Sequence, residues 1–157
     1  MAVIITNPSK HAEASVPISE QNKIILWLKR QVEFADFFEN YEINYNNLRT
    51  DVSNVSIIQN QGAVKSKQYV DGGYDGVIPI QIVVRTLGLT SEENKLHVID
   101  LLNQLGMWFE EHIHYNKDIV GFTIYSVAQQ TVAVIGYADE SGLVDVVADF
   151  RISYSKN

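Results

Sequence analysis

The segment Val77–Thr86, VIPIQIVVRT, alternates between strictly apolar residues and residues of mixed polarity. Ile78, Ile80, Ile82 and Val84 alternate with Pro79, Gln81, Val83 and Arg85. A pattern of period two is typical of a β-strand with one face in a hydrophobic core. Pro79 has no N–H to donate, so it is expected at a sheet edge, at a bulge or near the start of the strand. The segment Leu143–Ser155 shows the same alternation, and the turn residues 139–142 before it predict a hairpin.

Two segments have helical spacing of their apolar residues. The first helix is expected to have Ser19 as its N-cap and to extend to Tyr41, and the second to begin at Thr90 or Ser91. The first helix has two apolar stripes, so it is expected to pack against its own sheet and to leave apolar surface for a neighbouring molecule. The stripes are Ile25, Leu28, Val32 and Ala35, and then Trp27, Phe34, Phe38 and Tyr41.

The remaining segments complete a simple order of elements. The further predicted strands are Val52–Asn60, Ala63–Val70, Gly121–Ala128 and Thr131–Ala138, and Asn44–Asp51 is a predicted turn. The predicted order of elements is helix, three strands, helix, three strands. This order predicts an α+β fold, with an antiparallel or mixed sheet of about six strands and two main helices. We expect one domain over residues 1–157, with residues 1–16 as an arm or an edge strand, and no internal sequence repeat is evident.

Composition excludes several classes of protein. The chain has 157 residues with 12 basic and 19 acidic side chains, a net charge of −7, and no cysteine. Disulfides and thiolate metal sites are therefore excluded, and specific nucleic-acid binding and binding to anionic membranes are disfavoured. No transmembrane span or secretory signal is visible, so the protein is expected to be soluble and cytoplasmic.

No pattern of catalytic or metal-binding residues stands out. His112 and His114 are two residues apart, a spacing that places them on different sides of a helix and does not suit zinc. Asp71 and Asp75 lack the further oxygen ligands and the bidentate glutamate of a calcium loop. Neither a phosphate-binding loop nor a nucleophile elbow is present. The sequence therefore predicts no cofactor, no metal and no enzymatic activity.

The segment Asp71–Glu110 carries a family resemblance. A Gly-Gly-Tyr turn leads into the strand that ends in Arg85-Thr86, and the helix that follows contains Asn94-Lys-Leu and ends in Leu105-Gly-Met-Trp108. This arrangement resembles the small "minor capsid" or tail terminator proteins of phages and prophages with long, flexible tails. The resemblance covers about half of the chain, from the first helix through the second.

The resemblance implies a structural protein of the virion, assembled in the host cytoplasm. Such a protein forms a hexameric ring on the last ring of the tail tube, stops tube polymerisation and presents a surface to the head–tail connector protein. DNA passes through the ring without specific binding, and an acidic chain suits that passage because like charges repel.

Two groups of residues are candidate contact sites. Trp27, Phe34 and Phe38 are the expected anchors of an oligomer interface, because buried aromatic residues dominate interface energetics. The alternative is that these side chains fill the core of the monomer. The glycine-rich turn is the expected docking or pore loop, because glycine frees the backbone and a tyrosine beside it is a common contact residue. The alternative is a solvated turn with no contact role. That loop comprises Asp71, Gly72, Gly73, Tyr74 and Asp75.

Three alternatives stay open at this point. A head completion or connector subunit has a similar size and ring symmetry. A small hydrolase would use the cluster Glu110–His114 for catalysis. A small binding or immunity-type module would need no catalytic residues.

Overall fold

A computed structural model describes residues 4–5, 15–60, 62–112, 119 and 121–156. The chain has the predicted α+β fold, in which two helices pack against one mixed sheet. The helices are α1 (Ile18–Ala35) and α2 (Glu92–His112). The strands are β1 (Ile4–Ile5), β2 (Glu42–Tyr45), β3 (Asn54–Gln59), β4 (Val64–Tyr69), β5 (Tyr74–Thr86), β6 (Phe122–Gln129), β7 (Val134–Ala138) and β8 (Val144–Lys156). The sheet thus contains the six predicted strands together with β1 and β2.

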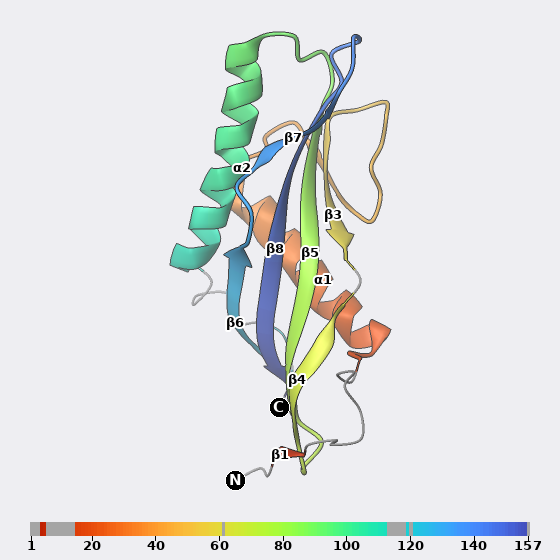
Figure 1. Cartoon of the computed structure of the whole chain (residues 1–157), viewed down its shortest axis with the longest axis vertical. Coiled ribbons are helices and arrows are strands. Elements are labelled where there is room, and N and C mark those ends of the chain that lie inside the picture. The colour runs from red at the N-terminus through yellow and green to blue at the C-terminus, as the bar shows by residue number, and fades with distance from the viewer. Residues whose placement is uncertain (1–3, 6–14, 61, 113–118, 120, 157) are drawn as a thin grey trace.

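The two segments with the clearest alternation form the centre of the sheet. β5 and β8 pair antiparallel along their full length, from Tyr74 opposite Lys156 to Thr86 opposite Val144. Beyond β5, β4 pairs with its first half and β3 with its second half. Beyond β8, β7 pairs with its first half and β6 with its second half. Each long strand is therefore flanked by two short strands placed end to end (Figure 1).

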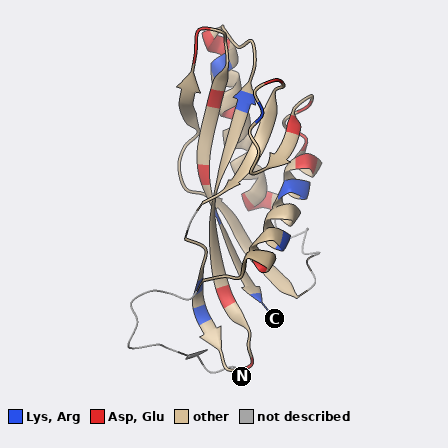
Figure 2. Cartoon of the chain, turned by 90° about the vertical axis from the view of Figure 1, so that its right-hand side faces the viewer, with Lys and Arg blue, Asp and Glu red and all other residues tan. Residues whose placement is uncertain are grey.

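One face of this sheet is buried under the helices. Most even-numbered side chains of β5 and β8 belong to a single hydrophobic cluster, and α1 lies along this side of the sheet (Figure 2). The fully buried members include Ile24, Leu28, Ile80, Ile82, Leu102, Leu105, Phe109, Phe150 and Ile152. Among the described residues, no helix combines the length and the apolar character needed to cross a membrane.

The first helix is shorter than predicted. Pro17 occupies the N-cap without a side-chain hydrogen bond, so Ser19 lies inside the helix and is not its cap. At the other end Asp36 has a left-handed conformation, φ 56°, which terminates the helix after Ala35. Aspartate tolerates this conformation better than most residues because its short polar side chain bonds locally. Phe38 and Tyr41 consequently lie beyond the helix.

The predicted turn Asn44–Asp51 overlaps a strand that the sequence did not reveal. β2 pairs parallel with β3, with Glu42 opposite Asn54 and Tyr45 opposite Ile57. A four-residue strand with two apolar positions is too short to show periodicity, and its stability comes from the partner strand. The sheet is therefore mixed. In the loop that connects β2 to β3, the backbone N–H of Arg49 donates a hydrogen bond to Asn54 Oδ1 at 3.1 Å.

The chain contains an internal structural repeat. β3–β4–β5 and β6–β7–β8 have the same order of pairing, seventy residues apart, and the irregularity between Lys65 and Lys67 recurs between Ile135 and Tyr137. The register shift between Ile124 and Ser126 of β6 has no counterpart in β3. Few residues are identical between the two halves, which explains why no repeat was evident in the sequence. The identities are Ser56/Ser126, Gln59/Gln129, Ala63/Ala133, Val64/Val134, Gly72/Gly142, Asp75/Asp145, Val77/Val147 and Ile82/Ile152.

The repeat also explains how Pro79 fits into a central strand. Its carbonyl accepts a hydrogen bond from Asn60 N–H on the side of β5 where β3 ends and β4 begins. In the second half, the equivalent Asp149 accepts from Gln130 N–H and donates its own N–H to Thr131 Oγ1 at 2.8 Å. Proline is tolerated because its missing N–H faces the gap between two short strands rather than a paired strand.

Candidate functional site

The exposed Phe34 and the partly exposed Trp108 meet where the C-terminal ends of the two helices come together. Phe34 of α1 is 74% exposed, and its ring centroid lies 6.3 Å from that of Trp108 on α2. Trp108 stacks on His112 with a centroid distance of 5.1 Å and an interplanar angle of 14°. Met107 is also exposed. We call Phe34, Phe37, Met107, Trp108 and His112 the helical aromatic patch.

The helical aromatic patch has a shallow hollow at its centre. Its volume is about 230 Å³, and it is lined by Phe37, Gln104, Met107, Trp108 and Glu111. The α2 side chains that line the hollow lie together because residues three or four apart, such as Gln104 and Trp108 or Met107 and Glu111, are on the same side of a helix. The ring of His112 is held in place by its Nδ1, which lies 3.1 Å from the carbonyl oxygen of Trp108. The patch is therefore a shaped apolar surface with a polar rim.

The predicted interface anchors do not lie together on the surface. Trp27 is 4% exposed and Phe38 is 5% exposed, and both belong to the hydrophobic core. Phe38 returns to the core because the helix ends at Ala35, and its ring packs edge-on against Tyr41 at 5.6 Å. Of the three predicted anchors, only Phe34 is available to another molecule. The members that the sequence did not point to as interface residues are Met107, Trp108 and His112 on α2, and Phe37 just after α1.

Tyr74 does not belong to a docking loop. It is 2% exposed, and its hydroxyl bonds the carboxylate of Glu20 and the hydroxyl of Tyr154, the latter at 3.2 Å. Lys65 lies over its ring at 4.6 Å. The side chain points into the molecule because Tyr74 is the first even-numbered residue of β5, and even-numbered residues of β5 face the core.

The rest of the predicted loop is a compact turn. Asp71 Oδ1 accepts a hydrogen bond from Gly73 N–H at 3.0 Å, and Gly72 has a φ of 92° that favours glycine. Asp75 lies inside β5 and accepts a hydrogen bond from the Tyr69 hydroxyl at 3.1 Å. Asp71 and Gly72 are exposed at the tip, so the accessible part of the loop is polar and carries no aromatic side chain.

The buried cluster around Tyr74 shifts several pKa values. Burial by itself raises the pKa of Glu20, but hydrogen bonds from Lys156 and Tyr74 outweigh it and leave the pKa below its ordinary value of 4.5. Burial, followed by the hydrogen bond to Glu20, raises the pKa of Tyr74. Burial also raises the pKa of Tyr154 to about 12. The ion pair between Lys156 and Glu20 ties the last strand to the start of α1.

The sheet face opposite the helices carries a largely buried ion pair. Arg85 donates two hydrogen bonds to Asp145, at 2.7 and 2.8 Å, from directly across β5 and β8. The hydrogen bond to Asp145 is the main reason that the pKa of Arg85 is raised. Asp149 lies on the same face and accepts a hydrogen bond from Gln81 at 3.4 Å. These are structural contacts between strands.

The histidine pair of the sequence is only partly within the described residues. His112 is the last residue of α2 and stacks on Trp108, whereas His114 lies outside the described residues. In the part of the chain that the structure describes, no three His, Cys, Asp or Glu side chains are grouped so that they could hold a metal ion.

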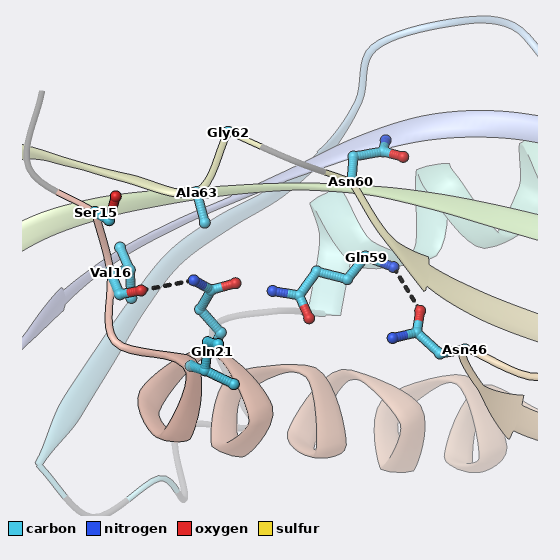
Figure 3. A pocket seen from close by; sticks show the side chains of 9 residues that line it. Ser15, Val16, Gln21, Asn46, Gln59, Asn60, Gly62 and Ala63 are labelled. Carbon is cyan, nitrogen blue, oxygen red and sulfur yellow. Dashed lines mark hydrogen bonds between the residues drawn. The ribbon is translucent and has the colours of Figure 1, made fainter. Parts of the chain in front are cut away.

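A larger hollow of about 430 Å³ lies between the start of α1 and the junction of β3 and β4 (Figure 3). Its polar lining is neutral, because it consists mainly of the carboxamides of Gln21, Asn46, Gln59 and Asn60. Gln21 Nε2 donates to the carbonyl oxygen of Val16 at 2.7 Å, and the backbone N–H of Gln59 donates to Asn46 Oδ1 at 2.9 Å. The described residues that line the hollow therefore offer hydrogen-bonding groups and no charged side chain.

Neither protein-family models nor curated proteins give a match to this chain. The functional argument therefore depends on the surfaces that the fold creates. The helical aromatic patch and β7 are two surfaces that expose large apolar side chains, and the patch is the one that contains a predicted interface residue, Phe34.

Proposed function

We propose that this protein is a structural subunit of a long phage tail, similar to tail terminator proteins. Six copies form a ring that caps the tail tube, stops its polymerisation and joins the tail to the head–tail connector protein. Its place is the virion, after assembly in the host cytoplasm, and its role is structural rather than catalytic.

The observation that carries this proposal is the exposed helical aromatic patch. Phe34, with 74% of its surface exposed, and the exposed Met107 flank the partly buried Trp108. Aromatic and methionine side chains are enriched in the centres of protein interfaces, and a few of them supply most of the binding energy. A second copy of the chain is the partner that the ring requires.

The charge of the protein supports a role around DNA. The net charge is −7, and Lys and Arg are interspersed with Asp and Glu over the strands and helices (Figure 2). On the sheet face opposite the helices, Arg85 is largely buried and paired with Asp145, so it is not free to bind phosphate. Such a surface lets DNA pass because it offers few sites for tight phosphate contacts.

Substitution of Phe34 tests the proposal. Native mass spectrometry and negative-stain electron microscopy of the wild-type protein should show rings of six. Phe34→Lys should stay folded, because its side chain is exposed, but its self-association should weaken by about 30-fold or more, as expected for the loss of an interface hot spot.

Leu96→Lys is the matched control, because Leu96 is an exposed apolar residue of α2 outside the patch. It should assemble like the wild type. Wild-type protein that stays monomeric at all concentrations, or Phe34→Lys rings that are as stable as wild-type rings, would overturn the proposal.

A further inference from the structure

The internal repeat allows the two outer edges of the sheet to be compared residue by residue. β4 and β7 occupy equivalent positions, and each has the same irregularity next to its partner strand. The irregularity is flanked by Lys65 and Lys67 in β4, but by Ile135 and Tyr137 in β7. Charged side chains protect an exposed edge from further strand pairing. The first edge therefore has this protection, and the second edge lacks it.

The two edges also differ in what pairs with them. β4 pairs on its outer side with β1, with Ile4 opposite Tyr69 and Ile5 opposite Gln68, and Ser15 forms an isolated bridge to Val64. Among the described strands, β7 pairs only with β8.

All residues of β7 are exposed, including Val134 at 54% and Tyr137 at 52%. Exposed apolar side chains beside unpaired backbone groups favour the addition of another strand. The β7 edge is therefore the more receptive of the two.

We propose that β7 binds the β1 segment of a second copy of this chain. The equivalence between β4 and β7 sets the register: Ile5 of the second copy lies opposite Ala138, and its Ile4 lies opposite Asp139, antiparallel to β7. Residues 1–7, MAVIITN, and residues 131–138, TVAVIGYA, have no charged side chain, and the charged residue within the register is Asp139, directly after β7. The inference rests on the self-association proposed above, and it adds a specific contact between neighbouring subunits.

The arm is long enough for this exchange. Ser15 is bridged to Val64, which lies opposite Val77 near the start of β5. The end of β7 lies at the level of Thr86, the last residue of β5, because Ala138 and Thr86 both pair with Val144. The distance along β5 is about 30 Å at about 3.3 Å per residue. An extended chain from residue 5 to residue 15 spans up to about 35 Å.

The direction of the chain is also suitable. In a ring, neighbouring subunits stand side by side with the same orientation. An arm that turns at Ser15 towards the Thr86 end of the sheet then runs antiparallel to β7. The β4 edge that it leaves behind tolerates exposure because Lys65 and Lys67 protect it.

Disulfide cross-linking tests the register directly, because the chain has no cysteine of its own. The variants Ile5→Cys and Ala138→Cys are mixed under oxidising conditions and separated on a non-reducing gel. Directly opposed residues of paired strands lie within the Cα distance that a disulfide requires. We expect a covalent dimer in the mixture and none in either variant alone.

The other outcomes separate the arm exchange from the proposed ring. A dimer in Ala138→Cys alone would show that two β7 strands pair with each other. No dimer in the mixture, with a ring still present by electron microscopy, would refute the arm exchange and leave the proposed function intact. A cross-linked assembly that is not hexameric would instead refute the ring and leave the arm exchange intact.

A charge substitution gives a second, independent measurement. Ile135→Lys combined with Tyr137→Lys gives β7 the lysines of β4, and it should abolish the cross-link while the variant stays folded. Val70→Lys, at an exposed apolar position in the β4–β5 turn, is the matched control and should leave the cross-link unchanged. A cross-link that persists in the doubly charged variant would refute the role of the β7 edge.

Discussion

At the scale of single residues, the cluster of Glu20, Tyr74, Tyr154 and Lys156 connects parts of the chain that are far apart in the sequence. The rings of Tyr74 and Tyr154 pack edge-on at 5.9 Å, and the Tyr74 hydroxyl and Lys156 both bond the carboxylate of Glu20. A buried polar group costs free energy unless it has a hydrogen-bond partner, and each of these groups has one. The cluster therefore stabilises the contact between α1 and the central strands.

Glu20→Gln should reduce stability in a pH-dependent manner. The pKa of Glu20 in the folded protein is below 4.5, so its stabilising effect is fully present above that pH and is lost as the pH falls through the folded-state pKa. At pH 7 we expect a loss of about 1–2 kcal/mol in the free energy of unfolding, since Lys156 is partly exposed and solvent weakens the pair.

The difference between wild type and Glu20→Gln should shrink below pH 4.5, as measured by urea denaturation at a series of pH values. Glu140→Gln, in the exposed turn before β8, should leave the unfolding curve unchanged. A difference that stays constant down to pH 3 would mean that the charge of Glu20 does not contribute.

At the scale of elements, the close approach of β5 to the ring of Tyr154 depends on a glycine. A Cβ atom at Gly76 would lie 2.5 Å from Tyr154 Cζ. That ring is fully buried and contacts the rings of Tyr74 and Phe122, at centroid distances of 5.9 and 5.8 Å, so it has little freedom to move. A larger residue at position 76 must therefore displace a packed aromatic side chain.

Gly76→Ala should destabilise the protein by about 1–3 kcal/mol, the usual cost of overpacking a core. Gly136→Ala in β7 is the control, because there the nearest atoms are Val147 methyl groups at 3.2 Å at the exposed edge of the sheet, where small shifts are possible. Thermal unfolding of the two variants measures the difference. Equal melting temperatures would show that the Tyr154 ring can move aside.

At the scale of the whole molecule, β5 and β8 hold the two repeated halves together. Each has 13 residues, they pair along their full length, and both have neighbours on either side. Unfolding either half exposes the edge of a long central strand, so the halves are expected to unfold as one cooperative unit.

Hydrogen exchange measured by mass spectrometry on dilute protein should show the slowest exchange in β5 and β8. Exchange in β7 should be faster, because only one of its edges is paired among the described strands. Raising the concentration until the protein assembles should slow exchange in β7 and leave β5 unchanged. Full protection of β7 in the monomer would contradict an open edge.

The candidate site could be predicted only in small part. Phe34 was identified as an interface residue from its place on a second apolar stripe, and it is exposed. Trp27 and Phe38 share that stripe but are buried. Trp27 lies on the side of α1 that packs into the core, and Phe38 follows the left-handed Asp36, which ends the helix before the chain turns into the core. Met107 and Trp108 join Phe34 through the packing of α1 against α2, which no local pattern encodes.

The sequence by itself determined the α+β class, the two alternating central strands and the approximate positions of both helices, because hydrophobic periodicity is a local property of the chain. Only the tertiary structure decided the parallel strand β2, the burial of Tyr74, the internal repeat and the unequal edges β4 and β7. These features depend on backbone hydrogen bonds and side-chain packing between segments far apart in the sequence. Backbone pairing needs few particular side chains, so a pairing pattern can recur in two halves that share few residues.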